Sequence, residues 1–293
     1  MRSEKTSAGM HWMLRMFSLP RVARVGIGPM IAAILLGAIL LLTLISPWIA
    51  PHDPLAMNPM MRLKPASDEY LLGTDNYGRD LFSRMILGGR ISLLIGLLAA
   101  AASIGVGVII GLIAGFFRTA DAIIMRMMDA LMAMPSILIA IALVALNGPS
   151  IGSVIIAITI PEIPRVVRLV RSVILTAREE PYVEAALALG SSTPKILFRH
   201  LLPNTMAPLI VQGTYIIASA ILTEAILSFL GAGISTEIPT WGNIMAEGRQ
   251  FFRIKPSTVL WPRLLLPLCV LSINPLGDAA SDTPDPRLQK RGG

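Results

Sequence analysis

The sequence predicts an all-α membrane protein with six transmembrane helices, and three observations lead to this prediction. The 293 residues are 54% hydrophobic and 15% charged, and the mean hydropathy is +0.69. The apolar residues form long runs without charge, such as the runs between Arg24 and Asp53 and between Arg90 and Arg118. A helix that spans a bilayer needs roughly 20 apolar residues, so these runs fit membrane helices better than a soluble core.

Each expected helix comes from one apolar run. The expected positions are near 27–50, 91–117, 121–146, 151–171, 206–231 and 257–277. A turn at Asn147-Gly148-Pro149-Ser150 separates the third helix from the fourth. The last helix departs most from a simple span because Arg263 lies inside it between two prolines. We expect this guanidinium to extend to the outer interface from the helix start.

Basic residues determine the predicted orientation. Residues 1–26 carry Arg2, Lys5, Arg15, Arg21 and Arg24, which predicts a cytoplasmic N-terminal segment. The following apolar stretch lacks an A-x-A cleavage pattern, so it is expected to be an uncleaved helix. Six crossings make 27–277 one membrane domain and place the tail 278–293 in the cytoplasm. Residues 51–89 and 232–256 then lie outside, and the loop 172–205 lies inside.

Composition excludes several functional classes. The net charge of +7 comes from basic residues at helix ends, without the interleaved aromatic residues of a nucleic-acid surface. A single cysteine, Cys269, allows no internal disulfide, and three histidines with one cysteine suggest no metal cluster. The chain contains no G-x-x-x-x-G-K-[ST] loop. We therefore predict no catalytic residues, no metal, and no cofactor or ATPase site in this chain.

The most informative segment is the polar loop EAALALGSSTPKILFRHLLPN, from Glu184 to Asn204. Val183, Ala186 and Leu187 have helical spacing, and Gly190 can end that helix in a left-handed conformation. A second short helix is expected to begin near Pro194, with Ser192 as its cap. It is expected to stop before Pro203.

This loop resembles the EAA loop of binding-protein-dependent ABC importer permeases. The matching residues are Glu184, Ala185, Ala186, Gly190, Leu202 and Pro203. His200 begins the pattern His-x-Leu-Pro-Asn, which is typical of the peptide and nickel branch of the family. The resemblance implies that the loop is a coupling helix seated in a groove of an ATP-hydrolysing subunit. Lys195, Arg199 and His200 complete the set of expected coupling residues.

Other segments resemble the same family. Leu72-Gly73-Thr74-Asp75-Asn76-Tyr77-Gly78-Arg79-Asp80 is similar to the segment before the second helix of one peptide-transporter permease. Asp75 and Gly78 favour a turn there, and we expect Arg79, Asp80 and Arg84 to pair. Further matches are Leu227–Gly231, Trp241–Asn243, Gly277-Asp278 and Asp285–Arg287. The stretch 256–283 is the least typical part.

The resemblance implies a type I importer subunit in the cytoplasmic (inner) membrane that works by alternating access. Its implied partners are a homologous second permease, two subunits that bind ATP and Mg, an extracytoplasmic substrate-binding protein, and membrane lipid. Peptides are the expected cargo, and nickel or another small solute is the alternative. Two rivals belong to other classes: an ion-coupled secondary transporter, which would not need this loop, and an intramembrane hydrolase, disfavoured by the lack of a nearby histidine.

Charged and small residues within the helices suggest further roles. Arg126 and Asp129 lie three apart and are expected to form a structural ion pair. Glu162, between two prolines, and Glu224, without a partner in its own turn, are possible residues of a translocation path. Glu224 has the alternatives of contacting a peptide amine or bonding to a neighbouring helix.

A row of small residues recurs at every fourth position of the second helix: Ala99, Ser103, Gly107, Gly111 and Gly115. Small residues on one face let two helix backbones approach closely in lipid. The row predicts either packing within the chain or a moving or dimerising seam.

Overall fold

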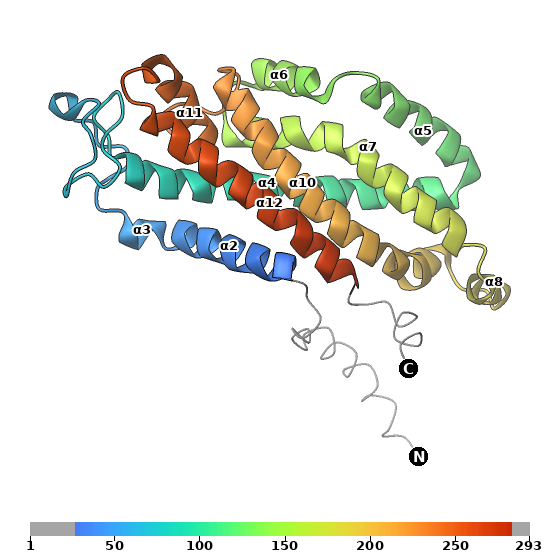
Figure 1. Cartoon of the computed structure of the whole chain (residues 1–293). Coiled ribbons are helices and arrows are strands. Elements are labelled where there is room, and N and C mark those ends of the chain that lie inside the picture. The colour runs from blue at the N-terminus through green and yellow to red at the C-terminus, as the bar shows by residue number, and fades with distance from the viewer. Residues whose placement is uncertain (1–26, 283–293) are drawn as a thin grey trace.

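The computed structural model describes residues 27–282, and this part of the chain is built from helices and loops (Figure 1). Within it, the only extended pairing is an isolated bridge between Thr74 and Asp80. The all-α class is therefore confirmed for the described residues. The predictions for segments 1–26 and 283–293 lie outside them.

Five long helices form the body of the molecule. They are α2 (Ile27–Leu44), α4 (Leu81–Phe116), α7 (Ile151–Ala177), α10 (Met206–Phe229) and α12 (Ser257–Asp282). Two medium helices, α5 (Arg118–Met132) and α6 (Ser136–Asn147), connect α4 to α7. The short helices are α3 (Ser46–Ile49), α8 (Pro181–Ala188), α9 (Thr193–Lys195) and α11 (Trp241–Gly248). Single turns of 3-10 helix occur at Pro59–Met61, Leu202–Thr205 and Arg249–Phe251, and a π-helix runs over Ile196–Leu201.

Three predicted helix boundaries, in the second, fourth and last helices, were wrong because polar residues cap or continue helices that apolarity alone does not reveal. The second helix begins at Leu81 and not near 91, since the carboxylate of Asp80 accepts a hydrogen bond from the Ser83 N–H at 3.0 Å and caps it. Residues 81–89 therefore belong to the helix and not to an outer loop. The last helix continues to Asp282, five residues beyond the predicted end at 277.

The predicted helix over 121–146 is broken into α5 and α6, whose axes meet at 87°. Pro135 stands at the N-cap of α6, and a proline disfavours helical backbone at the residue before it. In contrast, α7 runs unbroken through Pro161 and Pro164 and extends to Ala177. The backbone on both sides of Glu162 is therefore helical.

By length and apolarity, four described helical stretches can cross a membrane: Ile27–Leu44, Leu81–Phe116, Thr193–Phe229 and Ser257–Ala279. The bent pair α5 and α6 adds a fifth if it counts as one span. The helix α7 is long enough but carries Glu162, Arg165 and Arg168 in its first 18 residues. Length and composition thus support four or five of the six predicted crossings.

The row of small residues on α4 packs against α7. A Cβ atom added to Gly107 would lie 2.5 Å from Cβ of Val166, and one on Gly111 would lie 2.7 Å from Cβ of Val170. Gly115 faces Ile174 in the same way. Because these contacts advance in the same direction on both helices, α4 and α7 run parallel. Packing within the chain, one of the two predicted roles of the row, is confirmed.

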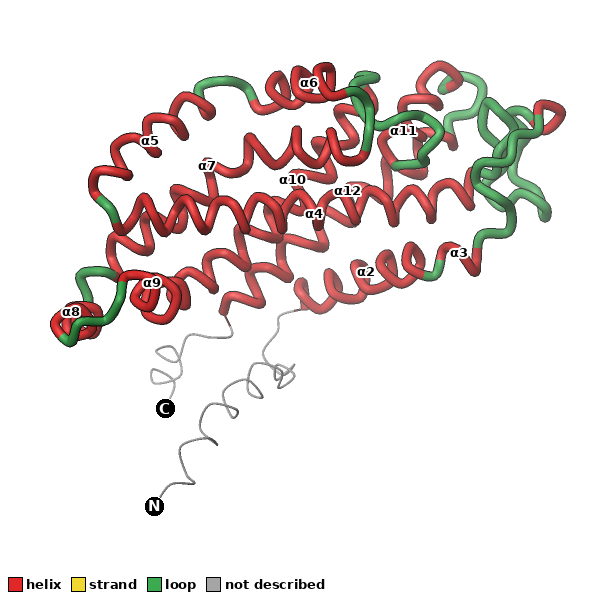
Figure 2. The backbone as a smooth tube through the Cα atoms, turned by 180° about the vertical axis from the view of Figure 1, so that it is seen from behind, coloured by secondary structure: helices red, strands yellow, loops and turns green. Residues whose placement is uncertain are grey.

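The two ends of the bundle carry different structures (Figures 1 and 2). The short helix α8 projects from one end, and the described ends of α2 and α12 point toward it. The loop before α4 and the helix α11 occupy the opposite end. We call this second region, residues 51–80 with 232–256, the outer lobe.

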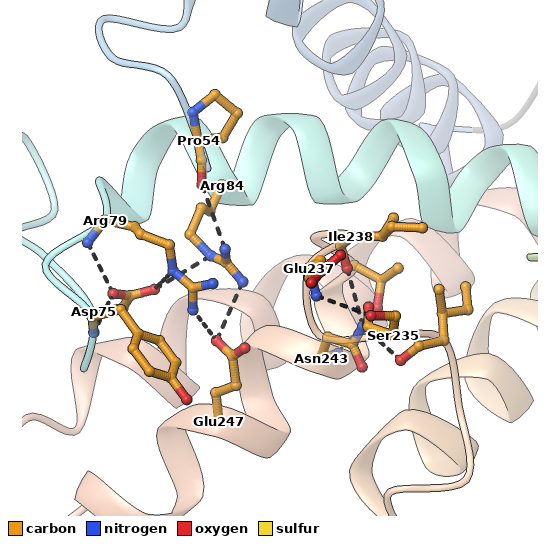
Figure 3. Close-up of polar contacts among 12 residues, drawn as sticks. Pro54, Asp75, Arg79, Arg84, Ser235, Glu237, Ile238, Asn243 and Glu247 are labelled. Atoms are coloured by element: carbon orange, nitrogen blue, oxygen red, sulfur yellow. Dashed lines mark hydrogen bonds and ion pairs between the residues drawn. The ribbon is translucent and has the colours of Figure 1, made fainter. Parts of the chain in front are cut away.

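A buried group of four charges joins the two parts of the outer lobe (Figure 3). Arg79 Nε lies 2.6 Å from the carboxylate of Asp75, and Arg79 also pairs with Glu247 on α11. Arg84 contacts Glu247 at 3.2 Å and Asp75 at 3.4 Å, and its side chain is fully buried. The two positive charges and the two negative charges balance. Charges that are buried need partners of opposite charge in this way. We call these four residues the outer quartet.

The predicted turn at Asp75 and Gly78 is confirmed, since the Gly78 N–H donates to the Asp75 carbonyl and Gly78 has φ +76°. The predicted pairing of Asp80 with the arginines was wrong, because its carboxylate caps α4 and lies 3.8 Å from Nδ1 of His52. Nearby, Lys255 donates to the carbonyls of Lys64 and Thr74. Burial lowers the pKa of Lys255 to about 8. Burial likewise raises the pKa of Glu247, against the opposing influence of Arg84 and Arg79.

The contact between α4 and α7 generates a first prediction. Gly111→Ala places a methyl group against Val170, so we expect a loss of about 1–3 kcal/mol in stability. The matched control is Gly105→Ala on the same helix, where an added Cβ has nothing within 4 Å. Because alanine favours helix over glycine, this control should be neutral or stabilising. Thermal unfolding of both variants in detergent tests the difference, and equal stabilities would contradict the packing argument.

The outer quartet generates a second prediction. Glu247→Gln leaves two buried arginines with one carboxylate, and we expect a loss of about 3 kcal/mol. Glu237→Gln, at an exposed position of the same outer segment, is the matched control and should have little effect. Replacing Arg84 by Gln in the Glu247→Gln background restores neutrality and should recover part of the loss. Chemical denaturation of the four proteins measures this, and an unchanged Glu247→Gln variant would refute the interpretation.

Candidate functional site

The helix α8 presents the Glu-Ala-Ala pattern at one end of the bundle. It begins at Pro181, whose fixed φ suits a first helical position, and its N-cap is Glu180. Val183 and Ala186 are buried, whereas Glu184 and Ala185 are exposed. The helix therefore fixes one face to the protein and turns the acidic face outward. Leu187, the third residue of the predicted apolar stripe, is 49% exposed, so the stripe is buried only in part.

Gly190 ends α8 in the left-handed conformation that the sequence predicts. Its φ is +75°, and an added Cβ would meet nothing within 4 Å. The Gly190 N–H donates to the Leu187 carbonyl and the Ser191 N–H donates to the Ala186 carbonyl, which together form a Schellman motif. Glycine is therefore required here for its backbone angle and not for space.

The second short helix differs from the prediction in two respects. Ser192 occupies the N-cap position of α9, but its side chain makes no capping hydrogen bond. The chain also does not stop before Pro203, because the helical path continues through Leu202–Thr205 directly into α10. Proline is tolerated there since it lies in the first turn of the 3-10 segment, where no backbone N–H is needed.

A polar bridge, which sequence reasoning missed, joins the two short helices. The Asn204 side-chain amide donates to the Tyr182 hydroxyl at 3.0 Å and to the His200 carbonyl at 2.8 Å. The rings of Tyr182 and His200 lie 6.5 Å apart. The His-x-Leu-Pro-Asn pattern was a signal for this asparagine, but only the fold shows that Tyr182 is its partner.

The structure brings all nine predicted loop residues into one hairpin of short helices, Pro181–Thr205, which we call the coupling hairpin. Val183, Ile196 and Leu201 hold it to a core cluster that also contains residues of α7 and α10. Large apolar side chains nevertheless remain exposed, with Leu189 at 86% and Phe198 at 59%. Of the predicted set, Ala186 is buried, His200 and Leu202 are half-buried, and the others are exposed: Glu184, Ala185, Gly190, Lys195, Arg199 and Pro203.

Glu162, a predicted path residue, lines a polar pocket between α6, α7 and α10. Its two carboxylate oxygens accept hydrogen bonds from Nη1 of Arg165 at 2.9 and 3.0 Å, and one of them accepts from Ser219 at 3.3 Å. The Arg165 guanidinium lies over the ring of Tyr215, 5.6 Å from its centroid. Sequence reasoning missed Arg165 and Tyr215 as members of this site.

Glu224, the other predicted path residue, is fully buried and lines no described pocket. It accepts hydrogen bonds from Ser92 at 3.1 Å, Ser228 at 2.8 Å and Thr240 at 2.7 Å. Ser228 lies one turn away on α10, so the inference that Glu224 lacks a partner in its own turn was wrong. Thr240 also caps α11 by accepting from the Asn243 N–H. Of the predicted alternatives for Glu224, bonding to a neighbouring helix matches these contacts.

The predicted ion pair between Arg126 and Asp129 is replaced by pairs between helices. Asp129 lies 2.6 Å from Arg168 of α7, and Asp121 pairs with Arg171. Arg126 is exposed on α5 and has no such partner among the described residues. The order of the two residues works against the pair within α5, because an ion pair in a helix is less favourable when the basic residue precedes the acidic one. Asp129 pairs with α7 instead.

Several known proteins are similar to this chain in sequence. A probable peptide ABC transporter permease of Sinorhizobium fredii is 52% identical over 239 residues, which are 82% of each chain. A di/tripeptide transport system permease of Pseudomonas aeruginosa is 43% identical over 253 residues, 84% of each chain. A dipeptide transport system permease of Alkalihalophilus pseudofirmus is 40% identical over 260 residues, covering 88% of this chain and 86% of the other.

A solved structure shows the same fold. It is the MetNI methionine ABC transporter in an inward-facing conformation, with a TM-score of 0.53 and 19% identity. The match covers 68% of this chain and 94% of the other. At this identity the likeness concerns the fold alone.

The family model described as the binding-protein-dependent transport system inner membrane component matches residues 107–290. This match spans more than half of the chain and contains the coupling hairpin and the pocket at Glu162. Together with relatives at 40–52% identity, it identifies the chain as a member of the family of binding-protein-dependent ABC transport system inner-membrane components.

Proposed function

We propose that the chain is the permease subunit of an ATP-driven importer that moves short peptides across the cytoplasmic membrane. Relatives that cover more than four fifths of the chain are named as peptide, dipeptide or di/tripeptide permeases. No described feature favours nickel over peptide. The permease contributes the membrane passage, and separate subunits supply the energy of ATP hydrolysis.

The coupling hairpin is the observation that carries this proposal. It combines exposed apolar side chains, Leu187, Leu189 and Phe198, with the exposed cations Lys195 and Arg199. Exposed apolar side chains gathered at one place indicate a protein partner. We assign the partner as an ATP-binding subunit whose groove receives α8. Movement of that subunit reaches the membrane helices because Val183 belongs to the same core cluster as Val170 of α7.

Six crossings support a cytoplasmic hairpin. Because α4 and α7 run parallel, the chain between them has to return across the membrane, and α5 with α6 provides that return. The helices α2, α4, α5 with α6, α7, α10 and α12 then make six passages. An even number puts both termini on the side of the coupling hairpin, in agreement with the basic residues of segment 1–26.

Charges at membrane depth support a second permease as partner. Arg165 lies near the middle of α7, and its side chain is 40% exposed in the isolated chain. A charged side chain facing lipid at this depth costs about 3 kcal/mol. This face therefore borders water or protein, as it would in a passage formed with a homologous permease. Alternating access would open that passage first to the outer lobe, where a substrate-binding protein docks, and then to the cytoplasm.

Glu162 is the stronger of the two proposed path residues. It lines the pocket between α6, α7 and α10, whereas Glu224 is enclosed by three hydroxyl groups and holds the start of α11. An ion-coupled transporter would need one of these carboxylates as an ion site. Glu162 already has a cationic partner in Arg165, so it is not a vacant site for a transported cation. This supports an ATP-driven importer over an ion-coupled transporter.

The backbone of the coupling hairpin generates a third prediction. Gly190→Pro cannot adopt φ +75° and removes an N–H that caps α8. We expect ATP hydrolysis stimulated by the peptide-loaded binding protein to be lost in the assembled complex. Gly190→Asn is the matched control, because asparagine tolerates the left-handed region and should retain most of the activity. If Gly190→Pro left both assembly and stimulated hydrolysis intact, the coupling role would be wrong.

The exposed apolar surface of the hairpin generates a fourth prediction. Leu189→Ser removes a side chain that is 86% exposed, so it should leave folding unchanged. We expect it to weaken binding of the ATP-binding subunits about tenfold, as for the loss of one buried leucine from an interface. Ile254→Ser, at a 73% exposed position of the outer lobe, is the control and should leave this affinity unchanged. Titration of the purified permeases with the ATP-binding subunits measures both, and equal affinities would exclude Leu189 from the interface.

A further inference from the structure

The pocket at Glu162 lies near the middle of the membrane helices. Glu162 is eleven residues after the start of α7 at Ile151, about 16 Å along the helix axis. Tyr215, on the opposite wall, is nine residues after the start of α10 at Met206, about 14 Å along its own axis. The accessible space is about 70 Å³, enough for several water molecules or for the polar end of a small ligand.

The lining of this pocket is polar at a depth where polar side chains are expensive. Four residues with hydroxyl groups line it together with the ion pair of Glu162 and Arg165: Ser136, Tyr215, Ser219 and Thr223. In contrast, the neighbouring faces of α4 and α7 are apolar and close-packed. Ionisable residues inside a membrane domain that line a cavity mark a substrate or ion pathway.

Much of the hydrogen-bonding capacity of the ion pair is unused. Both bonds from Arg165 to Glu162 use Nη1, so Nη2 and Nε take no part in the pair. A guanidinium has five N–H donors in a planar fork that matches a carboxylate. An ionised carboxylate has about four lone-pair sites, and among the residues that the structure describes Glu162 receives side-chain hydrogen bonds from Arg165 and Ser219 alone.

We propose that this ion pair is a subsite for the two charged ends of a short peptide, a specificity that rests on the proposed function. Glu162 receives the terminal ammonium group, and Arg165 receives the terminal carboxylate. The hydroxyl groups of Ser219 and Thr223 bond the peptide backbone between them. The pocket forms one wall of the site, and the facing permease completes it.

Charge balance explains why such a pair suits transient binding. The empty pocket is neutral because Glu162 and Arg165 neutralise each other, and a peptide with free ends is a neutral zwitterion at pH 7. Entry of the peptide exchanges one ion pair for two, and no net charge is buried at any stage. On release the two side chains pair again, so the site does not hold the cargo too tightly to let it pass. A transported species must be able to leave as well as enter.

The test uses the complete importer in proteoliposomes, trapped during ATP hydrolysis, and a dipeptide whose second residue carries a photoreactive diazirine. After irradiation, mass spectrometry locates the labelled residues. We expect adducts on α6, α7 and α10 around the pocket. Competing peptides are an unlabelled dipeptide, its N-acetylated form and its C-terminal amide. The free dipeptide should compete about tenfold better than either blocked form, as expected for one charge-assisted hydrogen bond.

Two variants separate recognition from a structural role. In Glu162→Gln the N-acetylated peptide should compete as well as the free dipeptide, while the amide remains about tenfold weaker. In Arg165→Gln the C-terminal amide should compete as well as the free dipeptide, while the N-acetylated form remains about tenfold weaker as a competitor. A purely structural pair would leave the preference for the free dipeptide over both blocked forms unchanged in the two variants, which would overturn the proposal. Glu237→Gln and Arg126→Gln, both at exposed positions, are the charge-matched controls.

Failure of the inference differs from failure of the proposed function. If the wild-type importer neither takes up peptide nor hydrolyses ATP in response to the loaded binding protein, the proposed function is wrong. If it does both, but labelling lies away from α6, α7 and α10, the subsite alone is wrong. The subsite is also wrong if the three unlabelled peptides compete equally well with the photoreactive dipeptide in the wild-type complex.

Discussion

The close contact between α4 and α7 is the constraint on which the rest of the structure depends. Glycines at positions 107, 111 and 115 let the two backbones approach until the β-branched side chains of α7 fill the space above them. In lipid, where apolar surface alone does not drive association, such packing supplies much of the attraction between helices. The contact also makes α4 and α7 parallel, so the chain between them returns from one end of the bundle to the other.

The helix α5 is held by a different kind of interaction. Met128 is its single buried residue, and its link to α7 consists of the pairs Asp121–Arg171 and Asp129–Arg168. Each pair is partly exposed to solvent, so each is worth little compared with the close packing of α4 on α7. The molecule therefore combines a rigid body, α4 with α7 and α10, and a helix, α5, that is attached more weakly. In contrast, α6 packs on α7 in a core cluster through Ala140 and Val144.

Sequence reasoning found what depends on local chemistry and missed what depends on contacts between distant segments. Gly190 and Gly78 were predicted in turns because a positive φ is a local property. The Glu-Ala-Ala pattern, the all-helical class and the small-residue row likewise follow from spacing. In contrast, the partner of Asp129 is 39 residues away on another helix, and Glu247 meets Arg79 across 168 positions. The 87° break at Pro135 also escaped prediction, because prolines 161 and 164 lie inside an unbroken helix and a proline alone does not decide the outcome.

The pocket lies where α7 and α10 of the rigid body meet α6. Its α7 and α10 walls belong to elements that share a core cluster with the coupling hairpin. Its α6 wall, with Ser136 and Ala140, lies between the break at Pro135 and the glycine turn at Gly148. Packed interiors resist continuous deformation, so a pull on the hairpin moves α4, α7 and α10 together. We expect the break at Pro135 and the turn at Gly148 to take up the displacement, so that the pocket changes shape where α6 meets the other two helices.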